Sequence, residues 1–276
     1  MNGIIDNLTS AVQTWNEKMA EIWTLLTQSP EEFKGGDIWK VIQNIHGALL
    51  AIGIALLVLF FVFGLVKTCT SVRELKRPEL IFRLFLRFAI ARILVTYGMD
   101  FIVAIFKIVQ GMITSVMTTV SFGTSTETII PEEVTNALSN VGFLDSIPLW
   151  AVTLLGAVFI TVLSFVLILT VYSRFFKLYM YAALSPIPLA SAASESTQQI
   201  AMSFLKSYIG VCLEGLVIII SCIIYTAYVK ALPAVDASAS AVTILWSYIG
   251  ETIFNMLILV GTVKMSDRVV KEMMGL

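Results

Sequence analysis

Apolar residues in this chain run in long tracts that are separated by shorter polar connections. The clearest tract, 47–66, contains no charged residue and is followed directly by Lys67. A helix of this length, rising about 1.5 Å per residue, covers the roughly 30 Å hydrocarbon core of a bilayer. Four further tracts of similar length lie at 88–109, 147–172, 207–229 and 242–263. Residues 46–276 are therefore predicted to form an all-α, polytopic membrane helix bundle with five transmembrane helices.

A sixth apolar stretch, 178–193, is short and is interrupted by two prolines. Pro186 and Pro188 lack amide donors, and the residue before a proline, such as Ser185, is disfavoured in a helix. Unpaired backbone is tolerated at membrane depth only where it is buried in protein or lines water. Two interpretations follow, a proline-broken helical hairpin that enters from one face and a broken sixth span.

Lysine and arginine are distributed unevenly between the connections. The connection 67–87 holds six basic residues, whereas 110–146 holds none. Because basic loops stay in the cytoplasm, 67–87 is predicted to be a cytoplasmic basic connection and 110–146 an outer loop. Five spans then place the N-terminus outside and the basic C-terminal tail inside. We favour this arrangement over six spans, which would leave that tail outside.

Two further segments have helical patterns. Within an extracytoplasmic N-terminal segment, 1–45, an amphipathic helix is predicted over 8–26, which either lies on the outer membrane surface or docks a partner subunit. A second helix, 79–109, is long enough to project into the cytoplasm. Its basic face either binds anionic lipid or docks an ATPase or anionic substrate. That face consists of Lys76, Arg83 and Arg87.

Composition supports the membrane class and gives little sign of enzymatic chemistry. The chain is 58% apolar and 13% charged, against roughly 25% charged residues in soluble proteins. The net charge of −1 does not favour a basic nucleic-acid binder. His46 is the single histidine, and no phosphate-binding loop, zinc motif or nucleophile elbow occurs. We expect no enzymatic activity, no catalytic or metal-ligating residue and no cofactor.

Ionisable and amide groups inside the predicted spans are the remaining candidates for function. Such groups are costly in a bilayer and usually face the bundle interior or water. They either bridge helices as structural contacts or form a polar seam that lines a passage or a protomer interface. The candidates are Asp100, Lys107, Glu214, Glu251 and Asn255.

The order of these features resembles the VirB-six/TrbL family of conjugative type IV secretion systems. The resemblance is strongest at 174–193, RFFKLYMYAALSPIPLASAA, which is followed by a polar patch at 194–199. The segment 74–79, ELKRPE, is similar to versions from Gram-positive conjugative elements. The resemblance implies a multi-pass subunit of the bacterial cytoplasmic (inner) membrane that forms a homo-oligomeric ring. It also implies VirB-type ATPases and a bitopic membrane subunit as partners, with transient contact to translocating DNA or protein.

Two functions from different classes follow, with a weaker third. The first is a secretion-channel subunit that helps to pass single-stranded DNA and attached protein across the membrane. The second is a small-solute or ion transporter that uses the mid-membrane carboxylates, although the internal repeat usual in transporters is not evident. The third is a membrane scaffold. Neighbouring genes for an ATPase and a coupling protein would favour the first.

Overall fold

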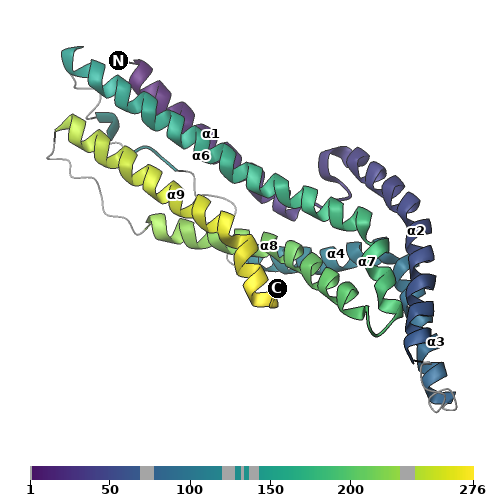
Figure 1. Ribbon diagram of the computed structural model, residues 1–276. Helices are drawn as coiled ribbons and strands as arrows, with labels where there is room; N and C mark the ends of the chain where they lie inside the picture. Colours follow the sequence, from purple (N-terminus) through teal and green to yellow (C-terminus); the bar gives the residue numbers. More distant parts are fainter. Residues whose placement is uncertain (1, 69–77, 120–127, 132–133, 137–142, 231–239) are drawn as a thin grey trace. The chain divides into compact units, whose positions relative to one another are not determined.

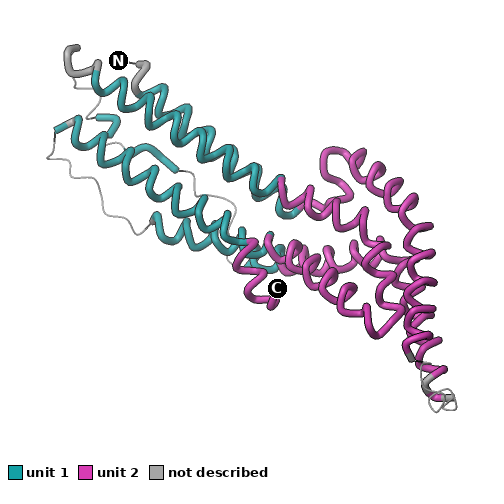
Figure 2. Tube along the Cα trace, in the orientation of Figure 1, with its two compact units in different colours: residues 1–27, 113–172, 215–266 teal, residues 28–112, 173–214, 267–276 magenta. Residues whose placement is uncertain are grey.

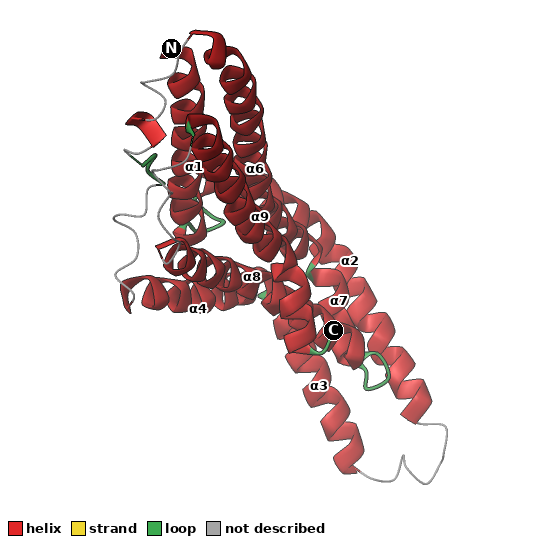
Figure 3. Ribbon diagram, turned by 90° about the vertical axis from the view of Figure 1, so that its left-hand side faces the viewer, coloured by secondary structure: helices red, strands yellow, loops and turns green. Residues whose placement is uncertain are grey.

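The computed structural model describes residues 2–68, 78–119, 128–131, 134–136, 143–230 and 240–276. The described part is helical and contains no strand (Figures 1 and 3). Its long helices are α1 (Asn2–Thr27), α2 (Asp37–Thr68), α3 (Pro78–Thr96), α4 (Gly98–Thr119), α6 (Phe143–Leu184), α8 (Gln198–Lys230) and α9 (Ala241–Met274). Three short helices join them, η1 (Phe33–Gly36), α7 (Pro186–Ala190) and η2 (Ser191–Ala193).

Within the described part of the chain, five helices are long and apolar enough to cross a membrane. They cover Phe33–Lys67, Gly98–Thr119, Pro148–Leu184, Gln198–Val229 and Val242–Met274. Many of their large apolar side chains are exposed, which suits a surface covered by lipid rather than by water. The predicted all-α membrane bundle with five spanning helices is confirmed.

The chain divides into two compact units (Figure 2). Unit 1 contains Met1–Thr27, Ile113–Tyr172 and Gly215–Ser266. Unit 2 contains Gln28–Met112, Ser173–Glu214 and Asp267–Leu276. Helices α4, α6, α8 and α9 therefore contribute residues to both units.

In unit 1, α1 is the predicted amphipathic helix, and the chain's own helices cover its apolar stripe. Trp15 is 1% exposed and meets the ring of Tyr225 of α8 edge-on, with ring centroids 6.3 Å apart. Tyr172 of α6 donates a hydrogen bond from its hydroxyl to Glu21 Oε1 at 2.8 Å. Since the chain's own helices bury the stripe, the prediction that the stripe rests on the outer membrane surface is wrong, whereas docking of a partner subunit by this helix stays a prediction. The buried stripe residues are Leu8, Val12, Trp15, Ile22 and Leu26.

The predicted continuous helix 79–109 is divided in the structure, so that prediction is wrong. Helix α3 ends at Thr96, Tyr97 forms a turn, and α4 begins at Gly98, where the chain changes direction (Figure 1). A Cβ at Gly98 would lie 3.0 Å from Leu189 Cδ1. At the bend, the backbone of Gly98, which has no side chain, therefore packs closely against α7. The predicted span 88–109 covers the end of α3 and the start of α4, whereas the apolar spanning helix is Gly98–Thr119.

The proline-broken stretch 178–193 lies within unit 2. Residues 178–184 complete α6, the helix breaks at Ser185, and α7 and η2 then pack against both α2 and α3. The chain reverses direction in a turn and enters α8 at Gln198. Burial in protein gives the broken backbone the environment that it needs. The shared core of these elements consists of Leu57, Ala91, Val95, Leu189, Ala190 and Ala193.

Candidate functional site

A buried arginine joins three helices of unit 2. Arg174, in the last part of α6, is 1% exposed. Its Nε donates to the carbonyl oxygen of Val211 at 3.2 Å, and its Nη2 donates to that of Cys212 at 3.1 Å. The guanidinium lies over the ring of Phe106 of α4, 5.8 Å from the centroid. Arg174 thus holds α6 against the middle of α8 and against α4.

One helical turn further along α6, Lys177 lies between two carboxylates. Its Nζ is 3.0 Å from Glu214 Oε1 of α8 and 3.1 Å from Asp267 Oδ1 of α9. Lys271 reaches the other oxygen of Asp267 at 2.8 Å. The Glu214 side chain is only 6% exposed, so its charge depends on Lys177 for compensation. We call Arg174, Lys177, Glu214, Asp267 and Lys271 the charged cluster.

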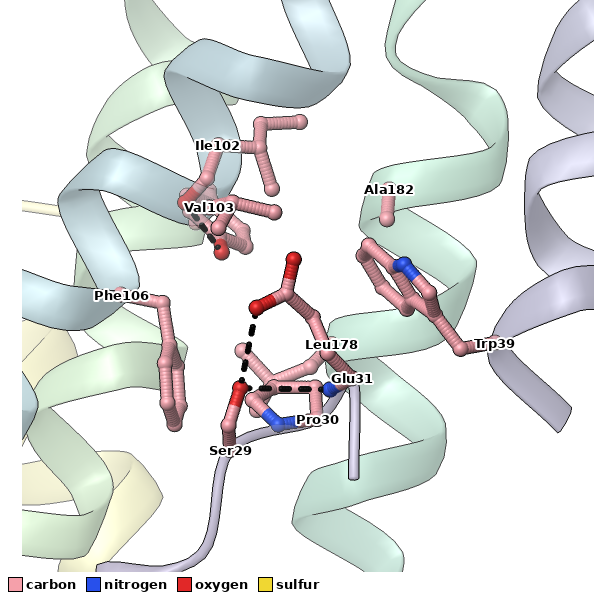
Figure 4. Close-up of a pocket in the computed structure, with 10 residues that line it drawn as sticks. Ser29, Pro30, Glu31, Trp39, Ile102, Val103, Phe106, Leu178 and Ala182 are labelled. Carbon is pink, nitrogen blue, oxygen red and sulfur yellow. Dashed lines mark hydrogen bonds between the residues drawn. The ribbon is translucent and has the colours of Figure 1, made fainter. Parts of the chain in front are cut away.

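Beside the cluster, unit 2 encloses a small and largely apolar cavity (Figure 4). Phe106, which stacks under Arg174, and Tyr208, whose hydroxyl donates to the carbonyl of Ile102 at 2.8 Å, both line it. Glu31 supplies a carboxylate at one edge, where the Ser29 hydroxyl donates to it at 3.5 Å. Among the described histidine, cysteine and acidic side chains, no three come together as a metal site.

The two predicted candidates on α4, Asp100 and Lys107, are both exposed. Lys107 Nζ lies 3.4 Å from Glu31 Oε2, in the segment before α2. This ion pair links α4 to the segment that leads into α2.

The predicted residues of α9 belong to the other unit. Glu251 is half-buried and Asn255 is buried in unit 1. The Asn255 side-chain oxygen has no hydrogen-bond partner among the described residues. Of the five predicted intramembrane candidates, Glu214 joins the charged cluster, and the polar seam stays a prediction.

The hairpin and the basic face meet in unit 2. Ser185 donates its hydroxyl to the carbonyl of Ala182 at 2.9 Å, which satisfies it at the break before Pro186 and Pro188. On α3, Arg83 is exposed, whereas Arg87 lies 3.4 Å from Glu195 in the turn after η2. The basic face is therefore partly neutralised by the hairpin. Lys76 lies outside the described residues.

Sequence reasoning missed four members of the cluster: Arg174, Lys177, Asp267 and Lys271. Of these, Arg174 and Lys177 entered it only within the segment 174–193, and Lys271 only within the basic C-terminal tail. The signal was that Arg174 and Lys177 follow an apolar tract without a polar break and sit among aromatic residues. Basic residues in such surroundings need buried acceptors, which the sequence does not identify.

Comparison with known proteins identifies one family. A family model described as "TrbL/VirB6 plasmid conjugal transfer like protein" matches residues 15–186. The match extends from α1 to the start of α7, so it includes Arg174, Lys177 and Ser185, while Glu214 and Asp267 lie beyond it. No curated protein and no solved structure matches the chain.

Proposed function

This chain belongs to the TrbL/VirB6 plasmid conjugal transfer-like family, and from that premise we propose that it is a channel subunit of a type IV secretion machine. As a family member with five spanning helices, it is a multi-pass membrane component of conjugal transfer. In the proposed role it helps single-stranded DNA with attached protein to cross the bacterial cytoplasmic membrane. The family match carries the proposal.

The proposed subunit forms a homo-oligomeric ring and has no motor of its own. VirB-type ATPases supply the energy, and a bitopic membrane subunit completes the assembly. The charged cluster supports a structural role in such an assembly, because it ties α6, α8 and α9 together at one point of unit 2.

A mating assay tests the function directly. In-frame deletion of the gene is expected to abolish DNA transfer, while growth of the host and the levels of the partner ATPases stay unchanged. Restoring the gene should recover transfer, which excludes effects on neighbouring genes. Normal transfer in the deletion strain would refute the proposal and make solute transport the leading function.

We further propose that the N-terminus lies outside and the C-terminus in the cytoplasm, with 178–193 on the cytoplasmic side. The serines nearest these segments, Ser194 and Ser266, are buried, so they are poor labelling sites. Glu195 and Met273 are exposed and are therefore suitable labelling sites. Single cysteines at Glu195 and Met273, in a chain without its native cysteines, should react with an impermeant maleimide only after the membrane is opened.

Thr135, which is exposed within the predicted outer loop, provides the control for this experiment. Thr135→Cys should react in intact cells. Reaction of Glu195→Cys in intact cells would show that the hairpin crosses the membrane. Reaction of Met273→Cys there would reverse the assignment of the C-terminus.

A further inference from the structure

Helix α3 lies alongside an apolar spanning helix of unit 2. Phe61 of α2 contacts Phe88 of α3, with ring centroids 4.6 Å apart. At the other end of α3, a Cβ at Gly98 would lie 4.0 Å from His46 Nε2 of α2. The two helices are therefore antiparallel and side by side (Figures 1 and 3). Because α2 carries the charge-free tract 47–66, α3 lies at the depth of a membrane span.

Arg92 lies on α3 near the middle of that depth. It falls between the two contacts just described, and its neighbour Ala91 shares a core with Leu57, which is close to the centre of the α2 tract. Arg92 is exposed and makes no ion pair with any described carboxylate. The neighbouring Ile90 and Ile93 are exposed as well. An uncompensated arginine is therefore present on an apolar surface at mid-depth.

Two other arginines of α3 have ways to avoid hydrocarbon that Arg92 lacks. Arg87 lies 3.4 Å from Glu195, and Arg83 lies toward the end of the α2 tract, where a long side chain reaches the headgroups. The middle of the tract is about ten residues, roughly 15 Å, from either end. Charges at that depth generally pair with another group or face water. The exposed face of α3 around Arg92 therefore requires a polar partner.

Helix α9 of unit 1 carries a carboxylate in a similar position. Glu251 is the single charged residue of the apolar tract 242–263 and lies near its middle. It is half-buried and makes no ion pair with any described basic residue. Ser247 and Phe254, one turn before it and one turn after it, are exposed. Glu251 thus lies at the edge of an open face of the spanning helix.

Two other carboxylates of the predicted spans fit the requirement less well. Glu214 is already compensated by Lys177. Asp100 lies two residues after the bend between α3 and α4, at the end of the depth that the α2 tract covers. Glu251 is therefore the acidic side chain that complements Arg92 in sign, in depth and in the absence of a described partner.

We propose that Arg92 of one copy forms an ion pair with Glu251 of the next copy, so that these faces of α3 and α9 form the contact between subunits. The contact is head-to-tail because two different surfaces meet, and a repeated contact of this kind closes into a ring when its rotation allows. Ala89 and Ser247, each one turn before a charged residue, are small enough for close helix approach. The proposal rests on the homo-oligomer of the proposed function, but not on DNA transfer.

Disulfide cross-linking between two differently tagged copies in native membranes tests the contact. One copy carries Ala89→Cys and the other carries Ser247→Cys or Phe254→Cys, in chains without their native cysteines. A disulfide requires Cα atoms within about 7 Å, so Ala89→Cys reaches position 247 if the two helices meet parallel and position 254 if they meet antiparallel. We expect oxidation by copper phenanthroline to give a dimer with both tags for one of these pairs. Since each chain holds one cysteine, such a dimer joins two copies.

Charge reversal shows whether the ion pair holds this contact. Arg92→Glu in the copy with Ala89→Cys should lower the yield of the two-tag dimer about tenfold, because like charges replace an attractive pair. Glu251→Arg in the other copy should restore most of the yield. Arg83→Glu is the matched control on the same helix and should leave the yield unchanged. Arg92→Gln, which removes the charge without reversing it, replaces Arg92→Glu if that variant does not accumulate in the membrane.

Three results would overturn the proposal. Absence of a two-tag dimer from both cysteine pairs would show that these faces do not meet. A yield that is the same with and without Arg92→Glu would show that the contact does not depend on Arg92. A fall that Glu251→Arg does not reverse would show that another group pairs with Arg92. Since none of these results depends on DNA transfer, failure of the mating test and failure of this one are distinguishable.

Discussion

Replacing Lys177 by methionine is expected to destabilise the protein by about 3 kcal/mol, a fall of several degrees in its melting temperature in detergent. Methionine keeps the length of the side chain but leaves Glu214, which is 6% exposed, with a charge and no counter-ion. Removal of one partner from a buried ion pair generally costs about 3–5 kcal/mol. Partial exposure of Lys177 places this case at the lower end of that range. Thermal melting of the purified protein measures the effect.

Two further variants show whether the effect comes from the buried charge. Lys177→Met combined with Glu214→Met should recover most of the stability, because an apolar pair can replace a buried ion pair at little cost. Arg268→Met is the matched control, since Arg268 pairs with Glu272 on the exposed surface of α9, and it should cost less than about 1 kcal/mol. If Lys177→Met were as mild as Arg268→Met, the cluster would not hold the helices together.

The double variant also separates structure from transport. If the protein with Lys177→Met and Glu214→Met accumulates normally and supports DNA transfer, the cluster is structural only. If it accumulates normally but transfer is lost, the charges take part in translocation. Either result assigns the one predicted candidate, Glu214, that the structure places in a buried ionic contact.

Local patterns in the sequence predicted the spanning helices and the proline break well. Hydropathy over one bilayer thickness and the missing amide of proline are properties of short segments, so they are readable without a fold. The division between α3 and α4 was not predicted, because the tract stays apolar through Tyr97. At the division, Gly98 lies close to Leu189, more than ninety positions away, and no local pattern reveals such a contact.

The same limit applies to what covers α1 and to the partners of the charged residues. Helical periodicity correctly predicted the apolar stripe of α1, which includes Leu8, Trp15 and Leu26. The pattern does not show which other helices cover that stripe. Lys107 pairs with Glu31, which lies far from it in the chain but close to it in space. Pairing of charges between helices depends on packing, which no spacing rule within one helix reveals.

Replacing Gly53 by alanine is expected to loosen the packing of α7 on α2. A Cβ at Gly53 would lie 2.7 Å from Pro186 Cβ and 2.9 Å from the Pro186 carbonyl oxygen. Because one of these atoms belongs to the backbone, the rotation of a side chain cannot relieve the clash. Helix α7 itself must move. Overpacking of this kind costs about 1–3 kcal/mol, more than the roughly 1 kcal/mol that alanine gains over glycine within a helix. A lower melting temperature should therefore result.

Gly47→Ala is the matched control, because it makes the same substitution on the same helix. A Cβ at Gly47 meets no atom within 4 Å, so only the helix-propensity gain remains and the melting temperature should hold or rise. Pro186→Gly in the Gly53→Ala background should restore part of the loss, since it removes the proline Cβ but not the backbone oxygen. Equal effects of Gly53→Ala and Gly47→Ala would mean that α7 is not seated on α2. The hairpin would then be free to cross the membrane, as the six-span interpretation requires.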